Sequence, residues 1–538
     1  NSLASDVTSD CVPVNMYANS LYPLGRVTGD FATPAEREYL FDTRHFDTDY
    51  EQIIFSIYTS GNVLNLPAGE AALGVGFEVR RDEIKSKPDA VAADGLFWGF
   101  FADKGAYGAR NVTEWFTELE IPLLVNKPLF TELNLNISAR FTDDEYYGNN
   151  TTEAIKLGWR PAESLLIRGT WGTAFRAPNL RELFLSGSTG FLNVSDPCYL
   201  PEEALNNLTG EYIPENDQRD PLVLSNCRAT GVDPTKANNG GFNTFSVEAE
   251  AGGALDLDPE ESESWTAGFA YEQNFTNKFK LSFGVTYYEI DITNTVIEPS
   301  TGFIVRDCYT DEAGDGSSAF CSRITRDLAS PENPQITFMD LGFINRDQEI
   351  ARGVDYNMSF NDQLNWGAPI DVSFNLNATR LIERSTQFTS PSGTVDYEEY
   401  AGEWGFPEWQ VQGALRFKWD RWTLTWETRF LDGVKQDAEA IDEFDSIAGG
   451  SDTCLGPPAD VLCRDYAEAN SYFRHSTSLF YKADTFILGA GIRNVFNRQP
   501  PRVDGSEVIS FSNTPIGFGY DLQGRTLFLD AVYLLGET

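Results

Sequence analysis

The chain has 538 residues, of which 81 are acidic and 40 basic, giving a formal net charge of −41. This charge excludes a nucleic-acid-binding surface, because neutralising phosphates requires clustered lysine and arginine. Aromatic residues make up 13% of the chain although its mean hydropathy is −0.32, a combination that we interpret as an apolar outer band around a hydrated interior and not as disorder.

Two kinds of membrane-directing segment are not recognisable in the sequence. No stretch reaches the roughly 18 apolar residues of a transmembrane helix. The first residues, NSLASDVTSDC, lack the basic start and apolar run of a signal peptide. If the protein is exported, we expect its signal peptide to be cleaved or to lie upstream.

Strict alternation of apolar and polar residues over about ten positions is the dominant pattern along the chain. In 131–141, for example, one face carries Leu133, Leu135, Ile137, Ala139 and Phe141, whereas the residues between them are polar or charged. The pattern predicts about sixteen strands, at 52–60, 71–81, 112–121, 131–141, 154–160, 163–174, 264–272, 279–291, 335–346, 350–360, 371–379, 409–419, 421–430, 472–481, 485–493 and 524–534.

Connections of two lengths join these strands. Short turns lie near 160, 275 and 483, and the single residue Asp420 separates 409–419 from 421–430. The long connections, rich in Gly, Pro, Asp and Asn, are predicted to be outer loops at about 1–50, 82–110, 178–260, 292–334, 382–407, 431–470 and 495–520. Short turns at one end and long loops at the other are typical of a transmembrane barrel.

Aromatic side chains gather near the strand ends, as an interfacial girdle requires. They include Tyr287, Tyr288, Trp409, Trp419, Trp422, Tyr472, Phe473 and Tyr481. A soluble propeller or sandwich would also alternate, but its strands usually run about five or six residues, whereas about nine to eleven are needed to cross a bilayer at a tilt. The sequence therefore predicts an all-β fold, a transmembrane antiparallel β-barrel, with no helical domain.

Six of the seven cysteines fall into three local pairs inside the expected loops. The pairs are Cys198 with Cys227, Cys308 with Cys321, and Cys454 with Cys463. We interpret them as disulfides, which implies an oxidising compartment. Zinc is a poorer interpretation, because CxxC spacing is absent and His45 and His475 are the only histidines. Cys11 is left unpaired or pairs with a residue upstream.

Catalytic motifs are not recognisable, and we expect no enzyme. Nucleotide loops, zinc spacings and nucleophile elbows are missing. An outer-membrane lipase would carry His and Ser two residues apart on one strand face, but Thr477 stands at that distance from His475. His475 is therefore predicted to be an interfacial barrel residue.

Two acidic stretches, 311–318 (DEAGDGSS) and 437–445 (DAEAIDEFD), have the carboxylates and Gly turns that can hold Ca²⁺. Neither has a known calcium-loop spacing, so solvated surface charge is the simpler interpretation and no cofactor is predicted. On the polar strand faces, Glu114, Glu118 and Glu120, with basic residues elsewhere, would hold water.

The segment ESLLIRGTWGTAFRAPNLRELF at 163–184 resembles one that recurs in TonB-dependent outer-membrane receptors. In those receptors a strand ends, and a loop begins, at the residues that are Phe175, Arg176, Ala177 and Pro178 here. Proline can end a strand because it donates no ladder hydrogen bond. Weaker similarities to the family lie at 157–161, 351–360, 491–503 and 524–535, and CVPVNMYAN at 11–19 resembles a subgroup with disulfide-clipped outer loops.

The resemblance implies a 22-stranded barrel in the outer membrane of a Gram-negative bacterium, plugged by an N-terminal domain. About six strands, the plug and a partner for Cys11 are then unaccounted for. We therefore expect an upstream polypeptide, in the same protein or a second chain, to supply them. Family members usually end on an aromatic residue, whereas this chain ends LLGET.

The resemblance also implies energy-coupled uptake of a scarce, large ligand, either an oligosaccharide or a ferric siderophore. The TonB inner-membrane complex would act through the plug. Four aromatic residues of the 178–260 loop could stack on sugar rings of the ligand: Tyr199, Tyr212, Phe242 and Phe245. Other expected partners are outer-membrane lipid and a surface lipoprotein or another outer-membrane protein. The alternative function is a passive porin or structural surface barrel without energy coupling.

Overall fold

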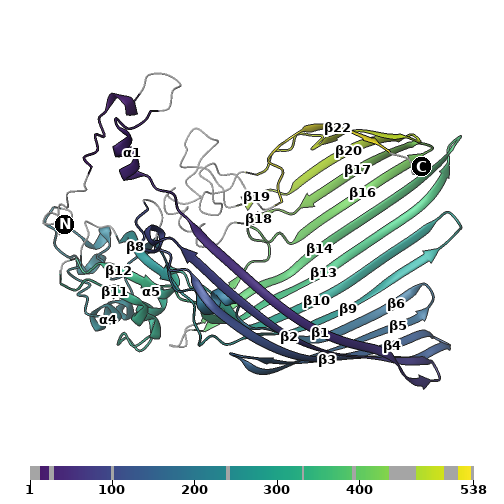
Figure 1. Cartoon of the computed structure of the whole chain (residues 1–538), viewed down its shortest axis with the longest axis horizontal. Helices are drawn as coiled ribbons and strands as arrows, with labels where there is room; N and C mark the ends of the chain where they lie inside the picture. The colour runs from purple at the N-terminus through teal and green to yellow at the C-terminus, as the bar shows by residue number, and fades with distance from the viewer. Residues whose placement is uncertain are drawn as a thin grey trace.

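Sixteen strands form one strongly curved antiparallel sheet (Figure 1). The structure is a computed structural model that describes residues 12–22, 29–97, 102–206, 208–237, 243–329, 333–389, 395–435, 468–501 and 519–534. Fifteen of them are neighbours in chain order: β1 (Phe46–Leu66), β2 (Gly69–Pro88), β3 (Ala106–Lys127), β4 (Phe130–Asp144), β5 (Gly148–Ala162), β6 (Leu165–Arg176), β9 (Glu260–Asn274), β10 (Lys280–Ile297), β13 (Ile344–Asn365), β14 (Pro369–Thr389), β16 (Trp409–Trp419), β17 (Trp422–Leu431), β20 (Tyr472–Lys482), β21 (Phe486–Arg493) and β22 (Thr526–Tyr533). The sixteenth, β15 (Val395–Glu399), pairs antiparallel with the last residues of β14. Within the described residues, β1 and β22 are the two edges of the sheet and do not pair with each other.

One face of this sheet is apolar. Leu119, Ile137, Ile155, Trp171 and Trp265 are successive partners across five strands, and partners in an antiparallel ladder project from the same face. Trp265 is 52% exposed. Large exposed apolar patches mark a surface that faces something other than water, and a lateral row of this kind on long strands suits lipid.

The opposite face is polar, and its side chains satisfy one another across strands. Glu114 accepts hydrogen bonds from Arg140 and Thr142, both at 2.8 Å. Asn136 donates to Glu118 at 2.8 Å. Because these residues alternate with the apolar row, the two predicted faces of 131–141 are confirmed.

Fifteen of the sixteen predicted strands lie in this sheet, but the prediction at 335–346 is wrong. Ile336–Asp340 forms β12, which belongs to a separate sheet, and Ile344 begins β13. Alternation shows that a strand has one buried face but does not show which sheet buries it. The strands are also longer than predicted, since β3 and β13 each have 22 residues, so they extend into segments predicted to be loops.

The turn between β16 and β17 has two residues and not one. Asp420, with φ of 49°, adopts the left-handed conformation that a tight hairpin favours and that Asp tolerates. Arg421 follows it and pairs with Asp484 of the neighbouring turn, Nη2 to Oδ1, at 3.2 Å. Short turns therefore lie together at one end of the sheet, as the sequence predicted.

At the other end, the connections β6–β9 and β10–β13 fold together into one small domain (Figure 1), which we call the loop domain and define as 188–251 and 300–341. Its elements are β7 (Ser188–Ser195), η2 (Glu202–Ala204), η3 (Pro214–Asn216), α4 (Pro221–Ala229), β8 (Thr244–Ala251), α5 (Thr301–Thr310), η4 (Ala319–Arg323), β11 (Ile324–Arg326) and β12. The strand order is β11-β12-β8-β7, and the β8–β12 contact, which joins the two connections, is parallel.

The loop domain has its own hydrophobic core. Val194, Val247, Ile304 and Met339 are almost fully buried and come from both connections. Two disulfides form part of this core, Cys198–Cys227 and Cys308–Cys321, and both confirm predicted pairs. Cys11 and the Cys454–Cys463 pair lie outside the described residues. The segments predicted to be surface loops are therefore partly a folded domain.

The remaining elements are short. They are η1 (Asn19–Leu21), α1 (Pro34–Leu40), α2 (Ala90–Ala93), α3 (Leu180–Phe184), β18 (Val434–Lys435) and β19 (Glu468–Ala469). The longest helix in the described part of the chain is the ten-residue α5, and none of its helices is long and apolar enough to cross a membrane.

Candidate functional site

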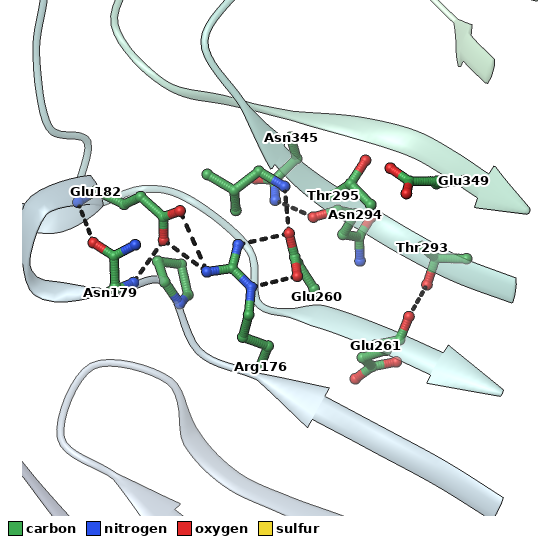
Figure 2. Close-up of polar contacts among 12 residues, drawn as sticks. Arg176, Asn179, Glu182, Glu260, Glu261, Thr293, Asn294, Thr295, Asn345 and Glu349 are labelled. Atoms are coloured by element: carbon green, nitrogen blue, oxygen red, sulfur yellow. Dashed lines mark hydrogen bonds and ion pairs between the residues drawn. The ribbon is translucent and has the colours of Figure 1, made fainter. Parts of the chain in front are cut away.

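The rim, where the strands meet the loop domain, is organised around Arg176, the last residue of β6 (Figure 2). Its guanidinium group holds two carboxylates from different segments. Nη2 donates to Glu260 Oε1 at 2.6 Å, and Nε donates to the other oxygen of the same carboxylate. Nη1 donates to Glu182 Oε2 at 3.0 Å. The planar fork of arginine suits this bidentate arrangement.

Glu260, the first residue of β9, connects the cluster to a third strand. Its Oε1 also accepts a hydrogen bond from the backbone N–H of Val296, near the end of β10, at 2.8 Å. Partial burial is the largest influence on Glu260 and raises its pKa, but the hydrogen bonds from Arg176 and from the Val296 N–H, together with the nearby positive charges, outweigh burial, so the pKa of Glu260 is lowered. The hydrogen bond to Glu260 in turn raises the pKa of Arg176. Both groups are therefore charged throughout the physiological pH range.

Glu182 links Arg176 to the short helix α3. The Asn179 side chain accepts from the backbone N–H of Glu182, and the Glu182 carboxylate accepts from the backbone N–H of Asn179, which makes a capping box. Asn179 follows Pro178 directly, so the expected motif of Phe175, Arg176, Ala177 and Pro178 leads from a strand end into a capped helix.

The backbone around α3 is closely packed. The carbonyl of Pro178 accepts from Arg110 Nη1 at 2.8 Å, and Arg110 lies between the carboxylates of Asp82 and Asp144, each 3.6 Å away. A Cβ at Gly253 would lie 2.6 Å from the carbonyl oxygen of Leu183, a distance that no larger residue tolerates without moving α3. The motif thus positions the chain where it leaves the sheet for the loop domain.

Replacing Arg176 by lysine is expected to loosen this junction without unfolding the sheet. A lysine ammonium cannot bridge two carboxylates bidentately, but Arg176 is 43% exposed, so solvent screening limits the loss to about 1 kcal/mol. Hydrogen exchange at the α3 amides and at Val296 should accelerate about 5-fold. Arg181→Lys, an exposed arginine of the same helix, should leave these rates unchanged, and equal rates in both variants would contradict the role of Arg176.

The aromatic residues predicted to contact ligand do not form an exposed platform. Tyr199 is 2% exposed and its ring packs edge-on against Phe245, so the prediction that it stacks on ligand is wrong for this conformation. Burial raises the pKa of Tyr199 to about 12. Phe245 packs against the same core, Tyr212 donates to Asp217 at 2.9 Å, and Phe242 lies outside the described residues. From the sequence alone, an aromatic residue in a Gly-rich loop that packs into a core cannot be distinguished from one that is exposed to ligand.

A buried ion pair in the loop domain was not found from the sequence. Asp196 and Arg326 form two hydrogen bonds, of 2.5 and 2.8 Å, and their side chains are 0% and 5% exposed. Burial is the largest influence on Arg326 and lowers its pKa, but the hydrogen bond to Asp196 and the interactions with Tyr309 and with the charge of Asp196 together outweigh burial, so the pKa of Arg326 is raised. Arg326 also donates to the Tyr309 hydroxyl at 2.9 Å. These residues come from three separate segments, so no local pattern could identify them.

His475 lies on the apolar face and not in a catalytic arrangement. Its Nδ1 shares a 2.9 Å hydrogen bond with the hydroxyl of Thr428 on the neighbouring strand. The rings of Trp426, Phe473 and Phe496 surround it at 5.3–6.2 Å between centroids. His475 is thus a barrel residue within an aromatic cluster, and its interfacial position stays a prediction.

The acidic stretch 311–318 uses its carboxylates locally. Asp311 accepts from the backbone of Ala313, and the side-chain hydrogen bond with Ser317 lowers the pKa of Asp315. No group of three or more His, Cys, Asp or Glu side chains in the described ranges is placed to hold a metal ion. The stretch 437–445 lies outside those ranges.

The chain matches a family model described as "TonB dependent receptor-like, beta-barrel" over residues 13–495. Matches to solved structures are extensive but distant in sequence. The siderophore receptor PirA from Acinetobacter baumannii is 13% identical, with 95% of this chain and 57% of that chain covered and a TM-score of 0.53. The ferric enterobactin receptor PfeA from Pseudomonas aeruginosa is 14% identical, with 90% and 54% covered and a TM-score of 0.52.

Matches at such low identity show the fold alone. They assign no ligand to this chain. The chain spans little more than half the length of the solved structures that it matches. No curated protein sequence matches it significantly.

Proposed function

The chain belongs to the TonB-dependent receptor family, and from this premise we propose that it serves in the energy-coupled uptake of a scarce, large ligand. Members of the family are transporters of the Gram-negative outer membrane and not enzymes, so the apolar face of the sheet faces outer-membrane lipid. The proposed ligand is an oligosaccharide or a ferric siderophore.

The observation that carries this proposal is the folded loop domain held on the rim of a polar-lined sheet. A domain with its own core and two disulfides is preorganised, and preorganisation lowers the entropic cost of capturing a dilute ligand. Through charge-assisted hydrogen bonds, the Arg176 cluster ties together the ends of β6, β9 and β10, from which the chain enters and leaves this domain. A passive porin selects mainly by pore width and pore charge, so it does not need a separately folded domain to capture its solutes.

Energy coupling is tested by comparing uptake in cells with and without TonB. Cells expressing the complete gene would be given tritiated malto-oligosaccharides and, separately, ⁵⁵Fe-loaded enterobactin. Accumulation of one of these probes should be above the level of gene-deleted cells and should fall to that level when tonB is deleted. Accumulation that survives tonB deletion would instead establish the passive porin.

A further inference from the structure

Arg380 of β14 is an arginine on the apolar face of the main sheet. Its partner on β13 is Val354, which pairs with Tyr287 on β10. Tyr287 pairs with Ala267, which lies two residues from Trp265 of the same face. Partners in an antiparallel ladder project from one face of a sheet, so the exposed side chain of Arg380 points to the lipid side.

The position of Arg380 along β14 places it at the edge of the hydrocarbon layer. On the apolar face this strand presents Val372, Phe374, Leu376 and Ala378 in succession, and Arg380 is the next residue on that face. It is the twelfth residue of β14, counted from the short-turn end, and a tilted strand crosses the hydrocarbon in about nine to eleven residues. Arg380 therefore lies at headgroup level in the leaflet on the loop side, which is the outer leaflet in barrels of this kind.

An aromatic pair holds the Arg380 guanidinium group in place. The group lies over the ring of Trp409, its partner on β16, with Cζ 5.8 Å from the ring centroid. Tyr356 stacks on the same indole, with 5.7 Å between ring centroids. The strands β13, β14 and β16, which carry these residues, are neighbours in the sheet (Figure 1). An aromatic ring attracts the charge of a guanidinium group but gives its N–H groups no conventional acceptor, so they can still donate.

Two other strands carry an arginine at the corresponding place, and both of these arginines are matched by carboxylates. Arg81 on β2 and Arg352 on β13 each lie just beyond four alternate apolar or aromatic residues of the same face. Arg81 Nη2 lies 3.3 Å from Glu83 Oε2. Arg352 forms ion pairs with Glu289 and Glu383 on the two neighbouring strands. The protein itself thus neutralises these two positive charges.

Arg380 differs from these two arginines because no carboxylate matches its charge. Its cross-strand partners are Val354 and Trp409, and in the described part of the chain it takes part in no ion pair or hydrogen bond. Glu383, the next acidic residue along its own strand, is engaged by Arg352. The net charge of −41 opposes an anion at long range, but at physiological ionic strength this repulsion is screened beyond about 8 Å. The local guanidinium group therefore selects an anionic headgroup.

We propose that Arg380 and the apolar surface beside it bind one phosphorylated lipid of the outer leaflet. The guanidinium group donates to the phosphate oxygens, which its planar fork suits, and Trp409 keeps this group at headgroup level. The acyl chains lie along the apolar residues of 372–378 on β14 and 411–417 on β16. The site anchors the sheet in the membrane, a role that goes beyond ligand uptake and does not depend on it.

Lipid binding to the protein expressed from the complete gene and purified in a non-ionic detergent tests this proposal. The probes are bisphosphorylated lipid A and the same lipid with its phosphates removed, and native mass spectrometry counts the lipid bound at each concentration. The unchanged protein should bind the phosphorylated probe more tightly. Arg380→Gln should weaken this binding about 5-fold, the contribution of one basic residue near an anionic lipid surface, and should leave binding of the dephosphorylated probe unchanged.

Arg81→Gln is the matched control, since Arg81 is exposed at the corresponding place on β2 but is paired with Glu83. This variant should bind both probes as the unchanged protein does. Millimolar inorganic phosphate should not displace the lipid, because the free anion has no acyl chains to pack on the apolar face. EDTA should not release the lipid, because no metal ion takes part. Unchanged circular dichroism spectra confirm that both variants are folded.

The proposal is overturned if the phosphorylated probe is not preferred, if Arg380→Gln binds it as tightly as the unchanged protein, or if Arg81→Gln weakens binding equally. Displacement by inorganic phosphate would show a site for the free anion and not for a lipid. Release by EDTA would show a metal bridge between the lipid and the rim carboxylates. Each of these last two results also overturns the proposal.

Discussion

Replacing Asp196 by alanine is expected to destabilise the loop domain by about 3–5 kcal/mol. The change removes the partner of Arg326 and leaves a guanidinium group, 5% exposed, without its counter-charge. The penalty for such an uncompensated buried charge lies in this range. Because the lost hydrogen bonds join the end of β7 to β11, native-state hydrogen exchange should show the amides of β7, β8 and β11 opening together with a reduced free energy, while amides of β3 and β4 keep their protection.

Asp315→Ala provides the matched control, because Asp315 is an aspartate of the same domain on its exposed surface. Its effect on exchange should stay within about 0.5 kcal/mol, as for most surface substitutions. If Asp196→Ala and Asp315→Ala have equal effects, the buried pair does not hold the two connections together, and the domain must be stabilised by its apolar core alone.

Converting both Cys198 and Cys227 to serine should cost the loop domain about 3.5 kcal/mol. The disulfide closes a loop with a sequence separation of 29 residues, and the chain-entropy estimate for a loop of that length gives this value. Both cysteines are 0% exposed, so the two serines would also place hydroxyl groups in an apolar core. Protease cleavage within 198–237 should become faster than in the unchanged protein, and intact-mass analysis of the digest locates the cut.

Cleavage in the turn between β9 and β10 is the internal reference for that experiment, since the turn lies at the opposite end of β9 and does not depend on the disulfide. Its rate should be the same in both proteins. A double variant that resists protease as well as the unchanged chain would mean that the core of the loop domain suffices without the covalent link.

The main sheet could be predicted from the sequence because its stabilising pattern is local. In a strand with one face in lipid and one in water, residues two positions apart lie on the same face and have similar polarity, as Ile137 and Ala139 do on β4. The strand at 335–346 had the same alternation, yet it pairs with β8 in the loop domain. A strand alternates wherever one of its faces is buried, so alternation could not assign this one to a sheet.

The rim and the loop domain could be predicted only in part. Phe175, Arg176, Ala177 and Pro178 were found through their resemblance to a family segment, but Glu260, which holds Arg176, is 84 residues away. Asp196 and Arg326 are separated by 130 residues. Tyr199 was mistaken for a ligand contact for the same reason, since its burial depends on residues from distant segments. Contacts at such separations leave no periodicity to detect.

The two disulfides in the described part of the chain each lie within one connection, at separations of 29 and 13 residues. The β6–β9 and β10–β13 connections are thus joined to each other by non-covalent contacts, chiefly β8 with β12 and Asp196 with Arg326. The loop domain thus consists of two disulfide-containing connections of one chain, which are tethered to each other through the β9–β10 hairpin. The tether makes their association intramolecular and sets a high effective concentration for it.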